Sequence, residues 1–248
     1  MPQRTIECPS GLAGVVRGLK GREGNLLTDQ REMQSGRALD RILAACWTET
    51  TAPGPYPQTE NGVIDWSRLL VCDHFYALMQ VRIATYGNTY SFGLACPSCR
   101  ERFEWDLPLD ELPVRALPEA SRERVKAADN RFDHVLSDGR RLVFRLPTVA
   151  EVRRAVNAVR QHTSETVVRA IASRTIEIDG GANTPATIVD ALNEMEMGEL
   201  PGVLAALEAI DGGVETEVDV TCPHCGSRLP VELPFGREYW LPKRTPTP

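Results

Sequence analysis

The chain has 248 residues, of which 42% are hydrophobic and 25% charged, so it is long enough to bury a core and has an ordinary globular composition. Its 28 lysines and arginines stand against 34 aspartates and glutamates, which gives a formal net charge of -6. This balance disfavours a general nucleic-acid-binding protein, because no overall positive field attracts phosphates. No apolar run reaches the roughly 20 residues that span a bilayer, and residues 1–20 lack a secretory signal, so we expect a soluble protein made in a cytoplasm.

The N-terminal part, residues 1–89, is expected to contain both strands and helices. Residues 4–19 surround a turn at residues 9–11, which predicts two extended pieces, and a mostly polar helical stretch follows them. Apolar residues at helical spacing come after Ser35. We therefore expect Ser35 to be the N-cap of a helix that ends near Trp47.

A loop and a long helix complete this part. The segment 50–62 contains three prolines and two glycines, so it is predicted to be a loop that is free to contact partners. Asp65 is the expected cap of the strongest predicted helix, residues 66 to about 85. Apolar residues cover most of the circumference of this helix, which indicates burial by neighbours on more than one side.

Two segments far apart in the chain, residues 90–107 and 215–233, share one pattern. In each, alternating apolar and polar residues flank a Cys-Pro-x-Cys turn, which predicts a β-hairpin with two thiols at its tip. Four thiolates from two such tips form a closed tetrahedral site for Zn²⁺, so the hairpins are the expected halves of a split zinc ribbon. The predicted ligands of one structural zinc ion are Cys96, Cys99, Cys222 and Cys225.

Other chemistry is open to two Cys-x-x-Cys turns. Redox dithiols of this kind usually open a helix after a strand, whereas both turns here lie between predicted strands. Disulfides fit a cytoplasmic chain poorly, and iron held by the four sulfurs remains an alternative to zinc. Gly226 follows the second turn, where a positive φ is often needed, but Arg100 departs from this pattern at the matching place of the first. His224, inside the second turn, is expected to be a bystander.

Residues 108–214 are predicted to hold a hairpin and several helices. A short charged helix over 119–128 precedes a hairpin over 131–146, whose turn carries an Asp-Gly pair. Thr148 and Glu151 have the spacing of a capping box, which opens a helix to about residue 162. The remaining predicted elements are helices over 165–174, 187–197 and 201–210, a short strand over 176–181, and an extended tail with four prolines over 234–248.

These elements predict a single domain over residues 1–248, of the α+β class. The expected fold is a mainly helical body with β-hairpins and a split four-cysteine zinc ribbon formed by two sequence-distant hairpins.

No catalytic site is evident in the sequence. Cys8, Cys46 and Cys72 are expected to be free thiols, two of them in apolar surroundings. The glycines near the N-terminus fit neither the Walker pattern nor the dinucleotide fingerprint. The histidines form no metal-binding pattern and are expected at surface or packing positions; they are His74, His134, His162 and His224. We therefore expect no catalytic residue, no small-molecule substrate and no cofactor other than the metal.

Several short phrases spread over most of the chain together resemble one family. They are Pro-Ser-Gly at residues 9–11, Arg-Gly-Leu-Lys-Gly-Arg-Glu at 17–23, the helix-to-ribbon passage 83–99, Phe-Glu-Trp at 103–105 with Leu-Pro at 112–113, and Leu-Ser-Asp-Gly at 136–139 leading to Phe-Arg-Leu-Pro-Thr at 144–148. The combination resembles the T4-like phage baseplate proteins, small tail proteins associated with the hub of contractile tails and with its assembly.

The resemblance implies a non-enzymatic structural or assembly component of a phage tail baseplate hub, or of a related contractile injection apparatus. Such a protein is expected in the virion tail or in the host cytoplasm during assembly, with other tail proteins as partners and several copies per assembly allowed. Nucleic acid and membrane insertion are not expected. Tyr56, Tyr239 and Trp240 would suit exposed interface anchors, the alternative being that they pack onto their own body.

A different function is a zinc-ribbon nucleic-acid-binding or transcription accessory protein. Arg100, Arg102 and Arg228 favour it. The acidic residues that oppose it on the same segments are Glu101, Glu104, Asp106, Glu215, Glu217, Asp219 and Glu232. A hydrolase with an unrecognised site is a third possibility, and it requires an acid-lined pocket or a metal with an open position.

Overall fold

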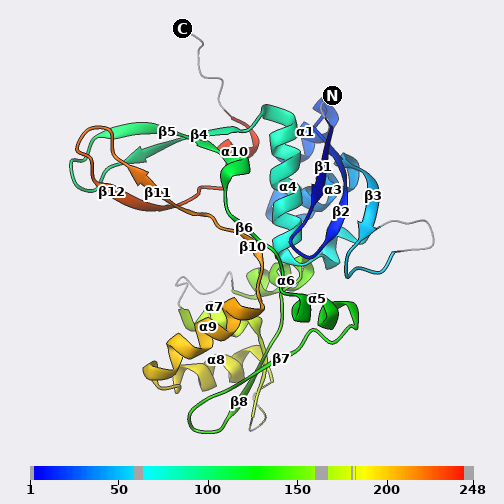
Figure 1. Ribbon diagram of the computed structural model, residues 1–248, viewed down its shortest axis with the longest axis vertical. Coiled ribbons are helices and arrows are strands. Elements are labelled where there is room, and N and C mark those ends of the chain that lie inside the picture. Colours follow the sequence, from blue (N-terminus) through cyan, green and yellow to red (C-terminus); the bar gives the residue numbers. More distant parts are fainter. Residues whose placement is uncertain (1–2, 59–63, 160–166, 180, 182, 243–248) are drawn as a thin grey trace.

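The computed structural model describes residues 3–58, 64–159, 167–179, 181 and 183–242. Figure 1 shows three parts: a first lobe formed by the N-terminal residues up to 86, an arm of two hairpins, and a second lobe formed by residues between 132 and 210. Helices take 42% and strands 27% of the residues, and the sheets are small. The fold is therefore mixed α+β, with a larger share of strand than a mainly helical body implies.

The first lobe contains a three-stranded antiparallel sheet in the order β1-β2-β3. Its strands are β1 (Gln3–Glu7), β2 (Leu12–Arg17) and β3 (Trp47–Pro53). A Cβ atom on Gly14 would lie 2.2 Å from the Glu49 carbonyl oxygen and 2.4 Å from the Trp47 ring, so only glycine permits this pairing. The two predicted N-terminal strands are confirmed. The predicted loop over 50–62 is wrong at its start, because residues up to Pro53 pair with β2, and residues 59–63 lie outside the described part.

Three helices of the first lobe follow β2. They are α1 (Gly21–Thr28), α2 (Gln30–Gln34) and α3 (Arg37–Cys46). The predicted helix up to Trp47 is confirmed, but its N-cap is Gly36, with φ 71°, and Ser35 instead ends α2. Glu23 at the start of α1 is buried and pairs with the buried Arg17 at 2.9 Å.

The helix predicted from residue 66 to about 85 is divided in two. Asp65 caps a single 3-10 turn, η1 (Trp66–Arg68), and α4 (Val71–Tyr86) follows. The two are separated because Leu70 pairs with Thr148 in an isolated bridge, which keeps the backbone extended there. Most of α4 is buried, and it packs against the sheet on one side and β10 (Gly213–Val214) on another, as its apolar circumference predicted.

A buried carboxylate at the start of α4 fixes the first turn of the chain. The Ser10 N–H donates to Asp73 Oδ1 at 3.0 Å, and the Ser10 hydroxyl donates to Oδ2. The Tyr56 hydroxyl donates to the same Oδ2 at 2.5 Å and accepts from the Leu70 N–H at 3.2 Å. Tyr56 is buried and has this internal role, so the prediction of an exposed interface anchor at Tyr56 is wrong.

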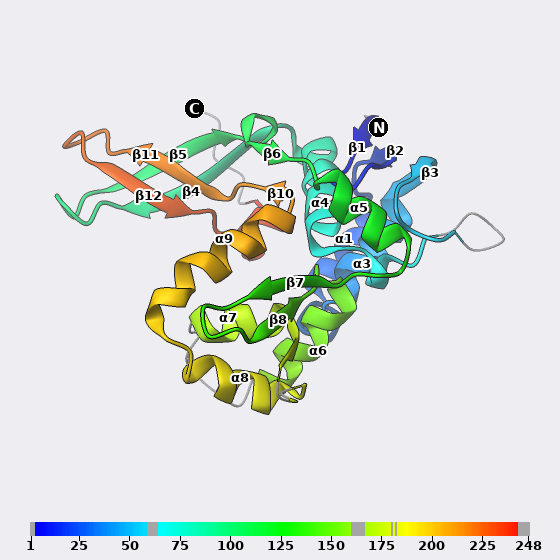
Figure 2. The ribbon, with the colours of Figure 1, turned by 60° about the horizontal axis from the view of Figure 1, so that its bottom comes forward.

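The arm consists of two antiparallel hairpins that lie side by side and project from the body (Figures 1 and 2). The first is made by β4 (Thr89–Ala95) and β5 (Arg102–Pro108), and the second by β11 (Glu217–Thr221) and β12 (Arg228–Glu232). Both predicted hairpins are confirmed. Between the arm and the second lobe, the outgoing strand β6 (Val114–Arg115) pairs with the returning strand β10, so the two connections are tied together.

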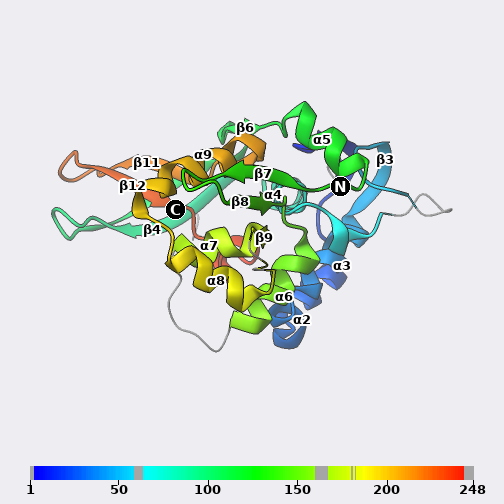
Figure 3. The same cartoon turned by 90° about the horizontal axis from the view of Figure 1, so that it is seen from below.

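The second lobe has a three-stranded antiparallel sheet, β7-β8-β9, with helices packed around it (Figure 3). The hairpin, the short strand and the helices predicted for this region are present among the described residues. Their bounds are β7 (Phe132–Val135), β8 (Arg141–Phe144), α6 (Val149–Val159), α7 (Val167–Arg174), β9 (Thr175–Ile178), α8 (Pro185–Asn193) and α9 (Leu200–Ile210). A 3-10 turn, η3 (Met197–Glu199), lies between α8 and α9, and the turn η2 (Leu109–Glu111) and the helix α5 (Glu119–Lys126) precede β7 in the chain. The Thr148 N–H and hydroxyl both donate to Glu151 at 2.9 Å, which makes one half of the predicted capping box. The other half is not made, because the Glu151 N–H donates to the Thr148 carbonyl at 3.1 Å and not to the hydroxyl.

The C-terminal segment folds back onto the first lobe. The predicted extended tail is wrong here, because Arg237–Trp240 form the short helix α10; residues 243–248 lie outside the described part. Tyr239 and Trp240 are only 1% and 7% exposed, so they pack onto their own body and are not surface anchors.

A buried arginine explains why this segment docks. The Arg82 guanidinium, on α4, lies 5.2 Å from the ring centroids of both Tyr90 and Tyr239. The Tyr86 hydroxyl donates to the Trp240 carbonyl at 2.9 Å. Cation-π contacts of this kind strengthen when they are removed from water, so α10 closes over a favourable aromatic cage.

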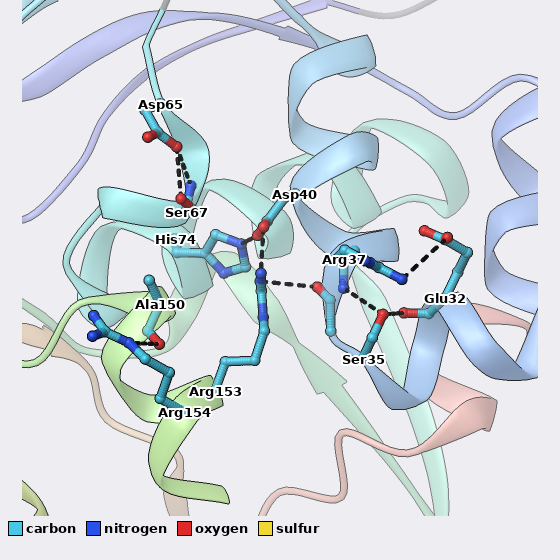
Figure 4. A network of polar contacts seen from close by, with 11 residues as sticks. Glu32, Ser35, Arg37, Asp40, Asp65, Ser67, His74, Ala150, Arg153 and Arg154 are labelled. Carbon is cyan, nitrogen blue, oxygen red and sulfur yellow. Dashed lines mark hydrogen bonds and ion pairs between the residues drawn. The ribbon is translucent and has the colours of Figure 1, made fainter. Parts of the chain in front are cut away.

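A polar network joins the first lobe to the second (Figure 4). Asp40 on α3 accepts from Arg153 on α6 at 2.7 Å and lies 3.0 Å from Nε2 of His74 on α4. Arg153 also donates to the Gly36 carbonyl at 3.1 Å. Burial by itself raises the pKa of Asp40, but the hydrogen bonds from His74 and Arg153 outweigh it and hold the pKa below its usual value.

The substitution Arg153→Ala is expected to lower the free energy of unfolding by about 2 kcal/mol, because it leaves a half-buried carboxylate with one partner fewer. Urea unfolding measures this value. Arg154→Ala is the matched control, since Arg154 is exposed on the same helix and should cost less than about 0.5 kcal/mol. Equal unfolding midpoints for the two variants would contradict a linking role for Arg153.

Candidate metal centre

The tips of the two arm hairpins have the same backbone construction. In the first, the Arg100 N–H donates to the Cys96 carbonyl at 2.8 Å and the Cys96 N–H donates to the Glu101 carbonyl at 2.9 Å. In the second, Gly226 and Cys222 make the two equivalent bonds, both at 2.9 Å. Each hairpin therefore closes with a tight turn that places its two cysteines on the same side.

The residue after each Cys-x-x-Cys turn has a positive φ. This angle is 74° at Gly226 and 67° at Arg100. Arg100 is thus a departure in residue type but not in conformation, since it adopts the left-handed geometry that its glycine counterpart adopts freely. The cost of placing a side chain there is of the order of 1 kcal/mol and is small against the gain that metal ligation would bring.

The structure brings the four cysteines of the two hairpins together. All four sulfur atoms lie within 4.8 Å of one another. The Cys96 and Cys225 sulfurs are 3.6 Å apart, and the Cys99 and Cys222 sulfurs are 3.8 Å apart. Four sulfurs at about 2.3 Å from a central zinc ion are about 3.8 Å from one another, so this donor set fits a tetrahedral metal.

The pKa values of the thiols differ because each sulfur has different hydrogen-bond donors and different sulfur neighbours. The Ser227 hydroxyl and N–H lower the pKa of Cys225 to about 6, and the Cys99 N–H lowers the pKa of Cys96. The Glu101 N–H also bonds to the Cys99 sulfur, but desolvation and the neighbouring sulfurs outweigh it and raise the pKa of Cys99 to about 12. A divalent cation relieves this conflict, because its charge stabilises all four thiolates at once.

The site stands on a small apolar core of its own. Cys96 and Cys222 are buried together with Phe103, Val220 and Leu229, which come from both hairpins. His224 is exposed, and its ring lies 6.5 Å from that of Phe103, so it is not among the clustered ligands. Four sulfur ligands leave no open coordination position, and such a site stabilises structure without catalysing a reaction.

The remaining cysteines are held as unreactive thiols. Cys8 and Cys46 are buried, and Cys72 is partly buried beside Asp73. Burial raises the pKa of all three thiols, that of Cys46 to about 11. A thiol becomes nucleophilic only as its thiolate, so these three are packing residues.

A family model described as T4 bacteriophage base plate protein matches residues 19–235. The chain belongs to this family of phage baseplate proteins. No curated protein and no solved structure matches the chain. The matched region contains all four clustered cysteines and both hairpins, so the candidate metal centre lies inside the part shared with other baseplate proteins. None of the described helices combines the length and apolar character needed to cross a bilayer.

Several buried polar residues of this baseplate protein were missed in the sequence. Within the largely apolar helix α4, the buried side chains of Asp73 and Arg82 anchor the first turn and the C-terminal segment. The buried His74 contacts Asp40, which also accepts from Arg153 of the second lobe. The expectation of a packing position holds for His74 and for His134, whose ring stacks on Phe144 at 6.2 Å; His162 lies outside the described part. The sequence did contain a signal for these contacts. Charged residues within a helix that is apolar on most sides are expected to be buried, and buried charged groups need hydrogen-bond or ion-pair partners.

Proposed function

We propose that this baseplate protein is a non-enzymatic structural or assembly component of the hub of a contractile tail, or of a related contractile injection apparatus. Family membership over residues 19–235 carries the proposal. The construction of the arm supports it, since a closed four-thiol centre serves to fix a shape and offers no position for a substrate. The protein then acts through contacts with other tail proteins.

We further propose that Cys96, Cys99, Cys222 and Cys225 bind one structural Zn²⁺ ion and so form the split zinc ribbon. Zinc is favoured over iron because the described residues that pack around the four sulfurs are apolar and offer no redox partner. The ion would hold the two hairpins, and through them the paired strands β6 and β10, in one frame. The ion is expected to be structural, and the protein is expected to have no small-molecule substrate and no membrane insertion.

The charge of the arm supports protein contacts over nucleic acid. The arm has three exposed arginines near its tips, two of them on its strands, against five acids on the same strands, so its strands are negative overall. The acidic residues on these strands are Glu104, Asp106, Glu217, Asp219 and Glu232.

In a phage that encodes this chain, removal of the chain is expected to prevent completion of tails, because a missing hub component leaves the baseplate unassembled. Electron microscopy and plaque counts measure this, and mass spectrometry of tails or assembly intermediates should detect the wild-type chain. Supplying the wild-type chain or its C72S variant should restore tails. Normal particle yield without the chain, or salt-dependent binding of DNA or RNA by the pure protein, would contradict the proposal and favour the nucleic-acid alternative.

A further inference from the structure

A groove in the second lobe is not used by the metal centre or by the contacts between lobes. It has a volume of about 520 Å³ and lies among α6, β9, α7 and α8. Figure 3 shows these elements close together in the second lobe. We call it the basic groove, because Arg145, Arg154 and Arg169 line it.

The basic groove is positive in a protein that is negative overall. Its lining contains three arginines and one glutamate, an excess of two positive charges, whereas the whole chain has a net charge of -6. The one acid, Glu151, is already engaged, since it accepts from Arg145 at 2.7 Å and from the Thr148 N–H and hydroxyl at 2.9 Å. The local field therefore favours an anionic ligand.

Arg154 is the arginine of the groove best placed to receive a carboxylate. Arg154 is exposed, and among its described contacts the guanidinium donates only through Nε, to the Ala150 carbonyl at 3.2 Å (Figure 4). Arg145 donates to Glu151 through Nη1, while its Nε is buried with no partner among the described residues. Planar guanidinium groups bind carboxylates through paired hydrogen bonds, so they suit an acidic protein segment.

The rest of the lining is apolar enough to select the class of ligand. Ile176, Val189 and Ala172 line the groove with partly exposed side chains, and the buried Ile188 also lines it. A nucleic-acid backbone offers little to cover such side chains, whereas a peptide that alternates carboxylates with aliphatic residues satisfies both surfaces. We propose that the basic groove binds an acidic, partly aliphatic segment of another tail protein. The identity of the partner as a tail protein rests on the proposed function; the binding chemistry does not.

Binding is tested with a fluorescein-labelled eight-residue peptide that alternates glutamate or aspartate with leucine or isoleucine. Its analogue with glutamine and asparagine in place of the acids has the same shape without the charge. Fluorescence polarisation with the full chain should show saturable binding of the acidic peptide that weakens as salt rises. The neutral analogue and the R154E variant should each bind about tenfold more weakly or worse.

The matched control is R228E, which reverses an exposed arginine on the arm and should leave the affinity unchanged. Thermal unfolding of both variants verifies that they fold. The proposal is overturned if the acidic peptide does not bind, if the neutral analogue binds equally, if R154E and R228E behave alike, or if a single-stranded oligonucleotide of equal charge displaces the peptide at physiological salt. If the peptide does not bind but the chain is found in tails, only the proposal for the basic groove is overturned. If the peptide binds but tails form normally without the chain, only the proposed function is overturned.

Discussion

Replacing Cys99 or Cys222 by serine is expected to release the metal and to lower the free energy of unfolding by several kcal/mol. Each substitution removes one of four ligands, and a structural zinc site contributes on the order of 10 kcal/mol in small modules. We expect the loss to be amplified here because Cys99 and Cys222 are 123 residues apart, so a shared ion would close a very long loop. Metal content per chain and urea unfolding measure the two effects.

The control for this experiment is C72S, since Cys72 is a thiol outside the cluster and should keep a full equivalent of metal. Pure wild-type protein with less than about half an equivalent of zinc, and no other metal, would refute the shared site. Iron in place of zinc would be visible by its colour and would correct the identity of the metal but not the ligand set.

Local pattern was sufficient to predict the arm, including which residues meet at its end. The alternation around each Cys-Pro-x-Cys turn specifies a hairpin by itself. The meeting of the two hairpins was predictable despite the distance between them, because a tetrahedral ion needs four ligands and each hairpin has two. The capping signal at Thr148 was equally local, and the half of it in which Glu151 accepts from the Thr148 N–H was confirmed.

The errors in the fold prediction occurred where distant pairing overrides local preference. Proline and glycine predicted a loop over 50–62, but β2 provides a partner for residues 47–53. The predicted single helix from residue 66 is divided because the Val71 N–H donates to Pro147 and the Val149 N–H donates to Leu69, at 3.0 and 2.9 Å. The basic groove could not be predicted either, since its arginines become neighbours only when α6 and α7 pack beside the segment that follows β8.

The phrase Arg-Gly-Leu-Lys-Gly-Arg-Glu at residues 17–23 has a physical explanation in the first lobe. Arg17 donates to Glu23 at 2.9 Å, to the Gly18 carbonyl at 2.8 Å and to the Ala45 carbonyl at 2.6 Å. Glu23 also accepts from the Lys20 N–H at 2.7 Å. A Cβ atom on Gly18 would lie 2.7 Å from the Ala84 carbonyl oxygen, so glycine allows the chain to pass close to α4. The phrase therefore encodes one buried ion pair with its surrounding turn.

The substitution Glu23→Gln is expected to lower the free energy of unfolding by about 3 kcal/mol at pH 7, because it leaves the buried Arg17 without its countercharge. Urea unfolding measures the difference from wild type. The matched control is Arg22→Ala: Arg22 also contacts Glu23, at 2.7 Å, but its side chain is 71% exposed, and exposed pairs contribute less than about 1 kcal/mol. Equal losses in the two variants would show that burial of the Arg17 pair adds nothing.

The pH dependence of the Glu23→Gln effect has a definite sign. Burial alone raises the pKa of Glu23, but hydrogen bonds from Arg17, Arg22 and the Lys20 N–H outweigh it and lower the pKa from 4.5 to about 2. The stabilisation by the carboxylate is therefore complete above about pH 4.5 and is lost as the pH falls towards 2. The difference between wild type and variant should shrink over this window. Loss of metal in acid weakens both proteins alike and cancels in the comparison, so a difference that stays constant down to pH 2.5 would place the stabilisation outside the ion pair.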